Sequence, residues 1–345
     1  MKDRLKNIFE SCVKIDNVLV WEPSTSPFYE AYLINIIHPK AQWSLMLRYT
    51  LSVSTTSSTP KTASLWGVFI DKKGTKTVAR ETFDMNKHDV VHTNRFISIG
   101  DSYFSLAEVV GSVHVKKTCL KWEFVFEDPV ISLRPFSTGL LDKCWINKFN
   151  LLVPRLVGFA SGSCFVDGYK KDLSRSRVYQ NHLFGPSFTH NGSWVNCLNF
   201  KEDSEAYVEA YNIKVPFWRK RHLTLNYFYL CMDGKKFFSQ SLIKALFFNK
   251  VFVESLRWTG SFKKKGYKFI INIKRLPSLT AGIPYEAPNR ASAFCYHSSL
   301  ANIEIKVYKR HKRSWQYYKT LSAQNKCSFE TVQPSQDKDL PLDIA

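Results

Sequence analysis

The feature that most constrains this chain is an alternation of apolar and polar residues that recurs along almost its whole length. It is clearest over residues 44–53, 120–127 and 302–307. A period of two with one polar face is typical of antiparallel sheet. Roughly eighteen to twenty such strands, separated by turn clusters at hairpin spacing, predict an all-β fold. Helical patterns of about 10 to 15 residues are almost absent, which argues against a parallel α/β fold.

The pattern also suggests how the chain is divided. Apolar residues repeat at helical spacing between residues 5 and 13, which predicts one short N-terminal helix. The alternation loosens between residues 128 and 161, where prolines and glycines interrupt it. We therefore expect an N-terminal β domain over 1–135, a linker over 136–158 and a C-terminal β domain over 159–332. Residues 333–345 are polar with two prolines and are expected to be disordered.

The charge balance is strongly positive. Lys and Arg number 49 against 29 Asp and Glu, a formal charge of +20, which attracts anionic surfaces. Basic runs at 219–222, 263–268 and 309–313 fall at apparent hairpin turns, and no recognised nucleic-acid motif surrounds them. We expect no nucleic-acid partner. If the runs cluster at one end, the expected contact is peripheral, with an anionic membrane surface.

Several classes of protein lack support in the sequence. None of the 8 cysteines forms a C-x-x-C pair and no Cys/His cluster has zinc spacing, so no metal site is expected. We interpret the cysteines as reduced thiols in a cytoplasmic protein. The N-terminus has no continuous apolar core of a signal peptide, and no apolar stretch reaches transmembrane length. Motifs of hydrolases, NAD-dependent enzymes and kinases are missing.

The stretch from residue 179 to 200, YQNHLFGPSFTHNGSWVNCLNF, has the most mixed chemistry. It places His182 and His190 just before an aromatic strand that begins at Trp194. Such residues between two alternating segments are typical of a sheet that closes around a ligand. The turn signals Gly-Pro and Asn-Gly equally fit a long hairpin with solvated histidines.

Short fragments recur in a fixed order along the chain. They include FYEAYLINIIHPKAQWSLMLRYTL, ASLWGVFID and KWEFVFED, then GSCFVDGYKKDL, QNHLFGP, SWVNCLNF and SSLANIEIKVYKR. This order resembles the two-domain lipocalin-like family of carotenoid 1,2-hydratase (hydroxyneurosporene synthase), tocopherol cyclase and the lipocalin-type Diels–Alderases. The most specific part is H-x-x-G before an aromatic strand, here His182, Gly185 and Trp194. Phe184 stands where that family commonly has Trp.

The resemblance implies two lipocalin-like antiparallel β-barrel or sandwich domains with an apolar pocket for a hydrophobic small molecule. Family members act without a metal or redox cofactor, so no cofactor is expected. The implied function is a hydratase or cyclase acting on an isoprenoid-like or polyketide-like substrate. The alternative is a non-catalytic carrier of a hydrophobic lipid, with no carboxylate or histidine pointing into its cavity.

Protonation of an alkene requires a carboxylic acid in a dry cavity lined by aromatic rings, because burial keeps the acid protonated and the rings stabilise a carbocation. Glu254 is the candidate proton donor, since in an unbroken strand over 251–258 it shares a face with Phe252 and Trp258. The alternative is an ion pair between Glu254 and a lysine. We expect His182 to direct substrate or water, and Trp194 to form a wall of the same cavity.

Further substrate contacts are expected from Phe184, Asn196, Tyr207 and Trp258. Tyr207 lies in the run 205–211, whose glutamates and tyrosines share one face and form a second candidate source of the acid. Because Glu and Tyr both tolerate water, we expect that face, including Glu209, to be solvated.

Overall fold

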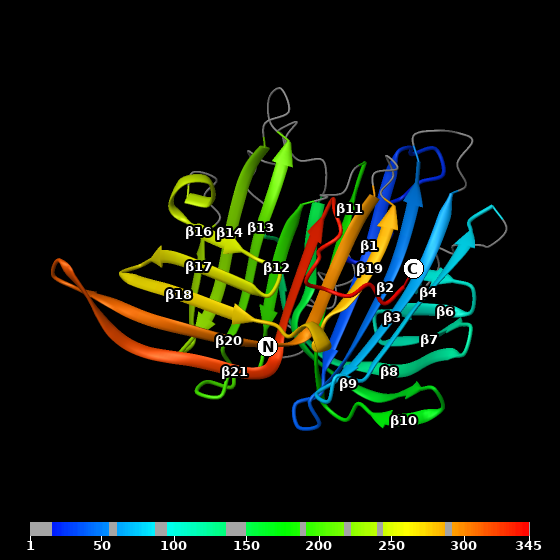
Figure 1. The fold of residues 1–345 in the computed structure, drawn as a ribbon, viewed down its shortest axis with the longest axis horizontal. Coiled ribbons are helices and arrows are strands. Elements are labelled where there is room, and N and C mark those ends of the chain that lie inside the picture. The colour runs from blue at the N-terminus through cyan, green and yellow to red at the C-terminus, as the bar shows by residue number, and fades with distance from the viewer. Residues whose placement is uncertain are drawn as a thin grey trace, which may run out of the picture.

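The computed structural model describes residues 16–54, 61–86, 95–135, 150–186, 191–216, 222–239, 244–286 and 292–344. These residues form two antiparallel sheets, of eleven and ten strands, which stand side by side in Figure 1. The predicted all-β fold class is therefore confirmed. The helix expected between residues 5 and 13 lies outside the described residues.

The first sheet, at the right of Figure 1, has the order β4-β3-β2-β1-β11-β9-β8-β7-β6-β5, with β10 paired to β9. Its strands are β1 (Phe28–Ile37), β2 (Trp43–Val53), β3 (Thr62–Asp71), β4 (Lys76–Asp84), β5 (Arg95–Ile99), β6 (Ser102–Ser105), β7 (Glu108–Val115), β8 (Thr118–Leu133), β9 (Asn150–Val166), β10 (Tyr169–Asp172) and β11 (Ser176–Gly185). Two meanders, β1–β4 and β5–β8, are thus joined through β9 and β11.

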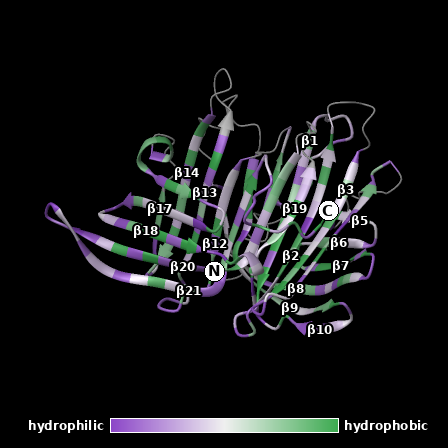
Figure 2. Ribbon diagram, viewed as in Figure 1, coloured by the Kyte–Doolittle hydropathy of each residue, from purple (hydrophilic) through white to green (hydrophobic). Residues whose placement is uncertain are grey.

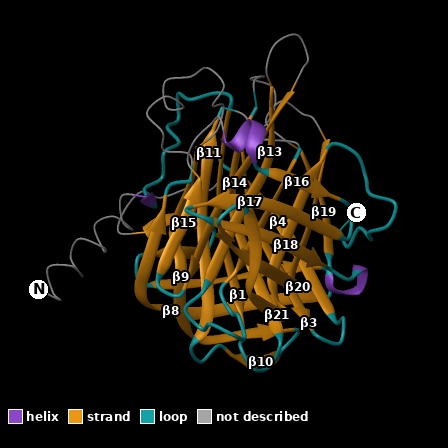
Figure 3. Ribbon diagram, turned by 90° about the vertical axis from the view of Figure 1, so that its left-hand side faces the viewer, coloured by secondary structure: helices purple, strands orange, loops and turns teal. Residues whose placement is uncertain are grey.

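The second sheet has the order β15-β14-β13-β12-β21-β20-β18-β17-β16, with β19 paired to β20. Its strands are β12 (Gly192–Cys197), β13 (Tyr207–Pro216), β14 (His222–Met232), β15 (Lys235–Ser239), β16 (Lys250–Val253), β17 (Arg257–Lys264), β18 (Tyr267–Lys274), β19 (Ala281–Glu286), β20 (Ser292–His311) and β21 (Ser314–Gln333). The second half of the chain also contains two short helical turns, η1 (Lys244–Phe248) and η2 (Pro277–Leu279). Helical segments are purple in Figure 3.

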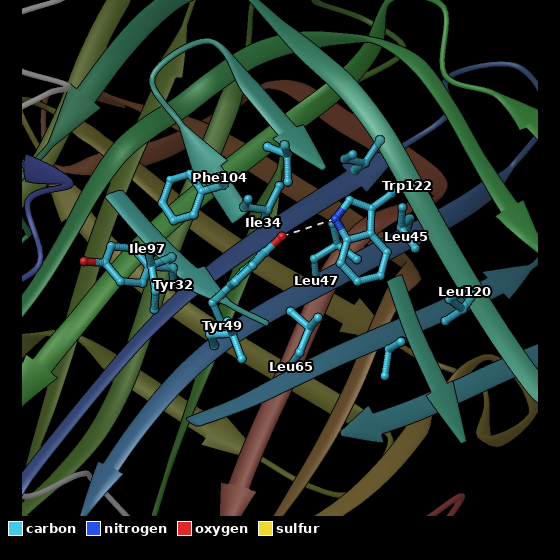
Figure 4. Packing of buried hydrophobic residues seen from close by; sticks show 14 of the residues in the cluster. Tyr32, Ile34, Leu45, Leu47, Tyr49, Leu65, Ile97, Phe104, Leu120 and Trp122 are labelled. Atoms are coloured by element: carbon cyan, nitrogen blue, oxygen red, sulfur yellow. Dashed lines mark hydrogen bonds between the residues drawn. The ribbon is translucent and has the colours of Figure 1, made fainter. Parts of the chain in front are cut away.

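Three apolar cores hold this arrangement together. One is formed by side chains of the first sheet and the segment before it. In this core the Trp122 indole N–H donates to the Tyr49 hydroxyl over 3.2 Å (Figure 4). A second fills the other sheet, and the third joins the two sheets. In Figure 2, green apolar and purple polar residues alternate along many strands. β1 is buried along its whole length because one of its faces packs in the first core and the other in the core between the sheets.

The change from one sheet to the other falls between β11 and β12. The expected linker covers residues 136–158, and the domain limits themselves remain a prediction. The expected second domain begins at Phe159 and so includes most of β9 together with β10 and β11. The structure instead hydrogen-bonds these strands into the first sheet. The physical reason is that β11 pairs with β1 along almost its whole length.

The C-terminal tail is held rather than disordered over residues 334–344. The Asp343 carboxylate forms an ion pair with Lys76 of β4 at 2.6 Å and accepts a hydrogen bond from the Gly282 backbone N–H of β19 at 2.9 Å. Leu340 is buried. The tail therefore links an outer strand of the first sheet to the second sheet.

Other features of the described residues can be stated briefly. Their six cysteines carry free thiols. No helix among them is both long and apolar enough to cross a membrane. No group of three or more His, Cys, Asp and Glu side chains in these residues could hold a metal ion.

Candidate active site

A small cavity of about 20 Å³, room for about one water molecule, lies against β13 and β14. Its wall is mostly aromatic and apolar and is formed by Leu133, Pro135, Glu209, Tyr211, Tyr227, Phe228, Tyr229 and Phe238. Leu133 ends β8 of the first sheet, whereas the residues from Glu209 onward belong to the second. Glu209 is the one carboxylate in this wall.

Strand register explains how this wall is built. Alternate residues of β13 share a face, so Tyr207, Glu209 and Tyr211 point together toward the first sheet. Glu209 lies opposite Asn196 of β12 and Tyr229 of β14. Tyr229 in turn lies opposite Phe238 of β15. One row across four strands therefore places a carboxyl group between an amide and two aromatic rings.

Three neutral donors bind the Glu209 carboxylate. The Tyr179 hydroxyl donates to Oε1 over 2.7 Å, and the Tyr211 hydroxyl donates to the same oxygen. The Asn196 amide donates to Oε2 over 2.8 Å. Tyr179 belongs to β11 of the first sheet, so this network crosses from one sheet to the other.

Burial raises the pKa of Glu209 to about 7, although the hydrogen bonds from Tyr211, Tyr179 and Asn196 oppose the rise. The carboxylate form loses its water when buried, and neutral donors replace only part of that hydration. Burial, followed by the neighbouring Glu209 charge, holds the pKa of Tyr179 and of Tyr211 well above the ordinary value. Near neutrality Glu209 can therefore both give and take a proton, while the two phenols stay protonated.

A second buried carboxylate, Glu330, lies on the same face of this sheet. In register, Glu330 of β21 is opposite Trp194 of β12, which is opposite Tyr211 of β13. Its Oε2 contacts His297 Nδ1 at 2.7 Å, and its Oε1 lies 3.8 Å from Arg48 Nη1 of the first sheet. Burial alone would raise the pKa of Glu330, but His297 and Arg48 together hold it below its usual value. Glu330 is therefore ionised at neutral pH.

Some of the predicted site residues lie beside Glu209. Asn196 binds its carboxylate, and Tyr207 shares its strand face. The Tyr207 hydroxyl lies 3.2 Å from the Tyr229 hydroxyl, and their rings stack at 5.6 Å. Trp194 lies between Tyr211 and Glu330 in register, half-buried, and its indole N–H has no hydrogen-bond partner among the described residues.

His182 and Phe184 lie elsewhere. Alternation along β11 turns them to the face opposite Tyr179, into the core of the first sheet. His182 Nδ1 donates to the Asp16 carbonyl over 2.8 Å, and Nε2 lies 2.8 Å from Glu30 Oε1. The ring of Phe184 lies 4.9 Å from that of His182. The expectation that His182 shares a cavity with Trp194 is therefore wrong, and His190 lies outside the described residues.

Glu254 is exposed to solvent, which corrects its expected place in the cavity. The segment 251–258 is not one strand, because a turn between β16 and β17 interrupts it and the Glu254 N–H donates to the Arg257 carbonyl over 2.8 Å. Trp258 is fully buried in the core of the second sheet and donates from Nε1 to Ser193 Oγ over 3.1 Å. His182, Trp194 and Glu254 thus do not converge.

The expectation of a solvated face around Glu209 is also wrong, since Glu209 is 1% exposed. A signal was present in the sequence. Residues 205–213, EAYVEAYNI, contain no lysine or arginine in a chain that has 49 of them. A solvated strand in so basic a protein would be expected to carry at least one of these residues.

Comparisons with known proteins give matches in structure alone. No protein-family model matches the chain, and no curated protein sequence matches it. A protein from Nitrosomonas europaea provisionally assigned as AttH matches with a TM-score of 0.56 and 6% identity, over 92% of this chain and 99% of its own.

Two further solved structures match to a similar degree. Kievitone hydratase from Nectria haematococca gives a TM-score of 0.55 and 8% identity, over 89% of each chain. CghA with Sch210972 gives 0.52 and 9%, over 89% of this chain and 88% of its own. At such low identity the likeness establishes the fold, which is the two-domain lipocalin-like one.

Proposed function

We propose that this protein is a hydratase or cyclase for a hydrophobic isoprenoid-like or polyketide-like substrate, with Glu209 as the general acid. The observation that carries the proposal is a fully buried carboxyl group with a pKa of about 7 in the aromatic wall of a cavity. Two proteins that share the fold, kievitone hydratase and CghA, support this direction. Glu209 replaces Glu254 as the proton donor.

The reaction begins with proton transfer from the Glu209 carboxyl to one carbon of an alkene. The π electron pair forms the new C–H bond and leaves a carbocation on the other carbon. The rings of Tyr229 and Phe238 can stabilise this cation by about 0.5–2 kcal/mol each. In hydration, a water oxygen then bonds to the cation and its proton returns to Glu209. In cyclisation, a second alkene attacks the cation and a neighbouring C–H proton returns to Glu209.

The donors around Glu209 stabilise the carboxylate left after proton transfer. Tyr179, Tyr211 and Asn196 are already directed at its two oxygens. Because they are in place before the reaction, little reorganisation is required as the charge develops. By stabilising the carboxylate, the same donors also lower its tendency to take a proton back. They therefore favour the acid step and oppose the base step.

The test does not require the substrate to be known in advance. A panel of isoprenoid and polyketide alkenes is incubated with the protein in D2O, and mass spectrometry detects products with a new C–D bond. We expect Glu209→Gln to lower the rate of deuteration by roughly 10²-fold or more, the usual effect of losing a general acid. The matched control is Glu254→Gln, which should retain the full rate.

Two outcomes would reject this role for Glu209. One is deuteration that persists at the same rate in Glu209→Gln. The other is tight binding of an alkene, measured by native mass spectrometry, without deuteration in the unmodified protein. The second result would favour the carrier function instead.

A further inference from the structure

One end of the second sheet carries a basic surface that the proposed reaction does not use. It comprises residues 244–253 (η1 and β16), the β17–β18 hairpin over 257–274 and the β20–β21 hairpin over 305–320, and we call it the basic edge. It lies at the left of Figure 1, away from the first sheet. Tyr267 pairs with Lys309, and the Arg310 N–H donates to the Gly266 carbonyl over 2.8 Å. The two basic runs 263–268 and 309–313 are therefore neighbours.

The charges on the basic edge are largely uncompensated. Residues 305–320 contain no Asp or Glu and carry these basic side chains: Lys306, Lys309, Arg310, Lys312, Arg313 and Lys319. Among the described residues, two of these six side chains form ion pairs: Lys306 with Glu304 at 3.5 Å and Lys319 with Asp233 at 2.7 Å. Residues 263–268 add four lysines. Such a concentration of positive charge attracts an extended anionic surface.

Exposed aromatic side chains accompany these charges. Phe247 is 74% exposed and Phe248 68% exposed, both on η1. η1 leads into β16, whose first residue, Lys250, pairs with Ser261 of the β17–β18 hairpin. Lys244, at the start of η1, lies close enough to Lys264 to contribute, after burial, to lowering the pKa of Lys264. Phenylalanine and basic groups therefore occupy the same end of the sheet.

We infer that the basic edge binds the surface of an anionic phospholipid bilayer. Its lysines and arginines would contact lipid phosphates and carboxylates, and Phe247 and Phe248 would enter the headgroup region. A bilayer is the anionic partner that offers hydrocarbon directly below its charges, so it matches both the basic groups and the exposed phenylalanines. This inference is independent of the role of Glu209.

The charge contribution is tested by flotation of the full chain with vesicles of phosphatidylcholine alone or mixed with phosphatidylserine. We expect binding only to the mixed vesicles, weakened by added salt. The double variant Arg310→Gln/Arg313→Gln should lower the partition coefficient by roughly tenfold or more, since each basic group near such a surface contributes substantially. Lys72→Gln/Lys73→Gln, in the turn between β3 and β4, removes the same charge and should change it less than about twofold.

The apolar contribution is tested by Phe247→Ala/Phe248→Ala, with Tyr169→Ala as control because Tyr169 is an exposed aromatic residue of the first sheet, 75% exposed. Only the phenylalanine variant should lose vesicle binding at raised salt. Circular dichroism checks that each variant is folded. The inference fails if no vesicle binds or if both charge variants lose binding equally. It also fails if a DNA oligonucleotide binds more tightly than the mixed vesicles and depends on Arg310 and Arg313.

Discussion

Glu209 and Glu330 are both fully buried on the same face of the second sheet, two strands apart, yet they differ in charge. Glu209 is surrounded by neutral donors and has a pKa near 7. Glu330 faces His297 and Arg48, and its pKa is lowered. Since neighbouring strands are about 4.8 Å apart, only about 10 Å separates their strands. Burial alone therefore does not set the charge of a carboxyl group in this protein.

The difference assigns the two groups to different tasks. A carboxylate beside a cation stays ionised at neutral pH and therefore cannot serve as a proton donor. Glu330 uses that charge to connect the two sheets, because Arg48 belongs to β2 and Glu330 to β21. Hydroxyl and amide donors instead leave Glu209 close to the point where acid and carboxylate are equally populated. The cavity also lies against Glu209 and not against Glu330.

The largest expected effect is at Glu330. Glu330→Gln leaves Arg48 and His297 buried without their carboxylate, and the loss of one partner of a buried ion pair typically costs about 3–5 kcal/mol. Urea unfolding at pH 7 measures the change. The matched control is Glu254→Gln, an equal change of side chain at an exposed position. A loss below about 1 kcal/mol would show that the pairing of Glu330 is not a main source of stability.

The second effect has the opposite sign and depends on pH. The folded pKa of Glu209 is about 7, above the ordinary 4.5, so ionisation of the unfolded chain lowers stability as pH rises from 4.5 to 7. Glu209→Gln cannot ionise. The difference in free energy of unfolding, variant minus unmodified protein, should therefore increase by about 3 kcal/mol between pH 4.5 and pH 8. This figure follows from the conversion of about 1.36 kcal/mol per pKa unit. A difference that stays constant over this range would contradict the raised pKa.

A smaller effect is expected from one of the neutral donors. Tyr179→Phe removes the hydroxyl that donates to Glu209 Oε1, and this hydrogen bond favours the carboxylate form. The pKa of Glu209 should rise further, by up to about one unit, since a net hydrogen bond contributes about 0.5–1.5 kcal/mol. Carbon-13 NMR titration of labelled glutamate measures it. Tyr49→Phe, in the core of the first sheet, should leave the titration unchanged, and a fall in the Tyr179→Phe pKa would refute the assignment.

The smallest effect is expected at Glu254. Because its side chain is exposed, Glu254→Gln should change the free energy of unfolding by no more than about 0.5 kcal/mol at any pH from 5 to 8. Chemical denaturation at several pH values checks this. A larger, pH-dependent change would mean that Glu254 contributes to the free energy of unfolding as the two buried glutamates do, despite its exposure.

The sequence predicted the strands better than the site because alternation reports which residues share a face and not what covers it. Glu209 and Tyr211 share a face with Tyr207 as expected, but a face covered by a second sheet has the same pattern as one that tolerates water. The cover is supplied by Tyr179, 30 positions away in the chain. A single sequence gives no direct information on that contact.

The error at Glu254 has a different origin. The run 251–258 contains no Gly or Pro, so nothing local marked the turn that separates β16 from β17. His182 was expected to face the same cavity as Trp194, but it lies on β11 with its side chain in the core of the first sheet. One step along a strand reverses the direction of a side chain, so the face cannot be assigned without the strand register. The partner of His182, Glu30, 152 positions away, could not be inferred from local pattern.

The strand order of the first sheet has a consequence for the nascent chain. When residue 135 has left the ribosome, β1–β4 and β5–β8 exist, but the strands that join them, β9 and β11, do not. β1 and β8 then each present an unpaired edge, which invites association with other chains. Translation must proceed to Gly185 before both edges are covered. A fragment ending near residue 135 should therefore aggregate, whereas one ending after β11 has every strand of its sheet.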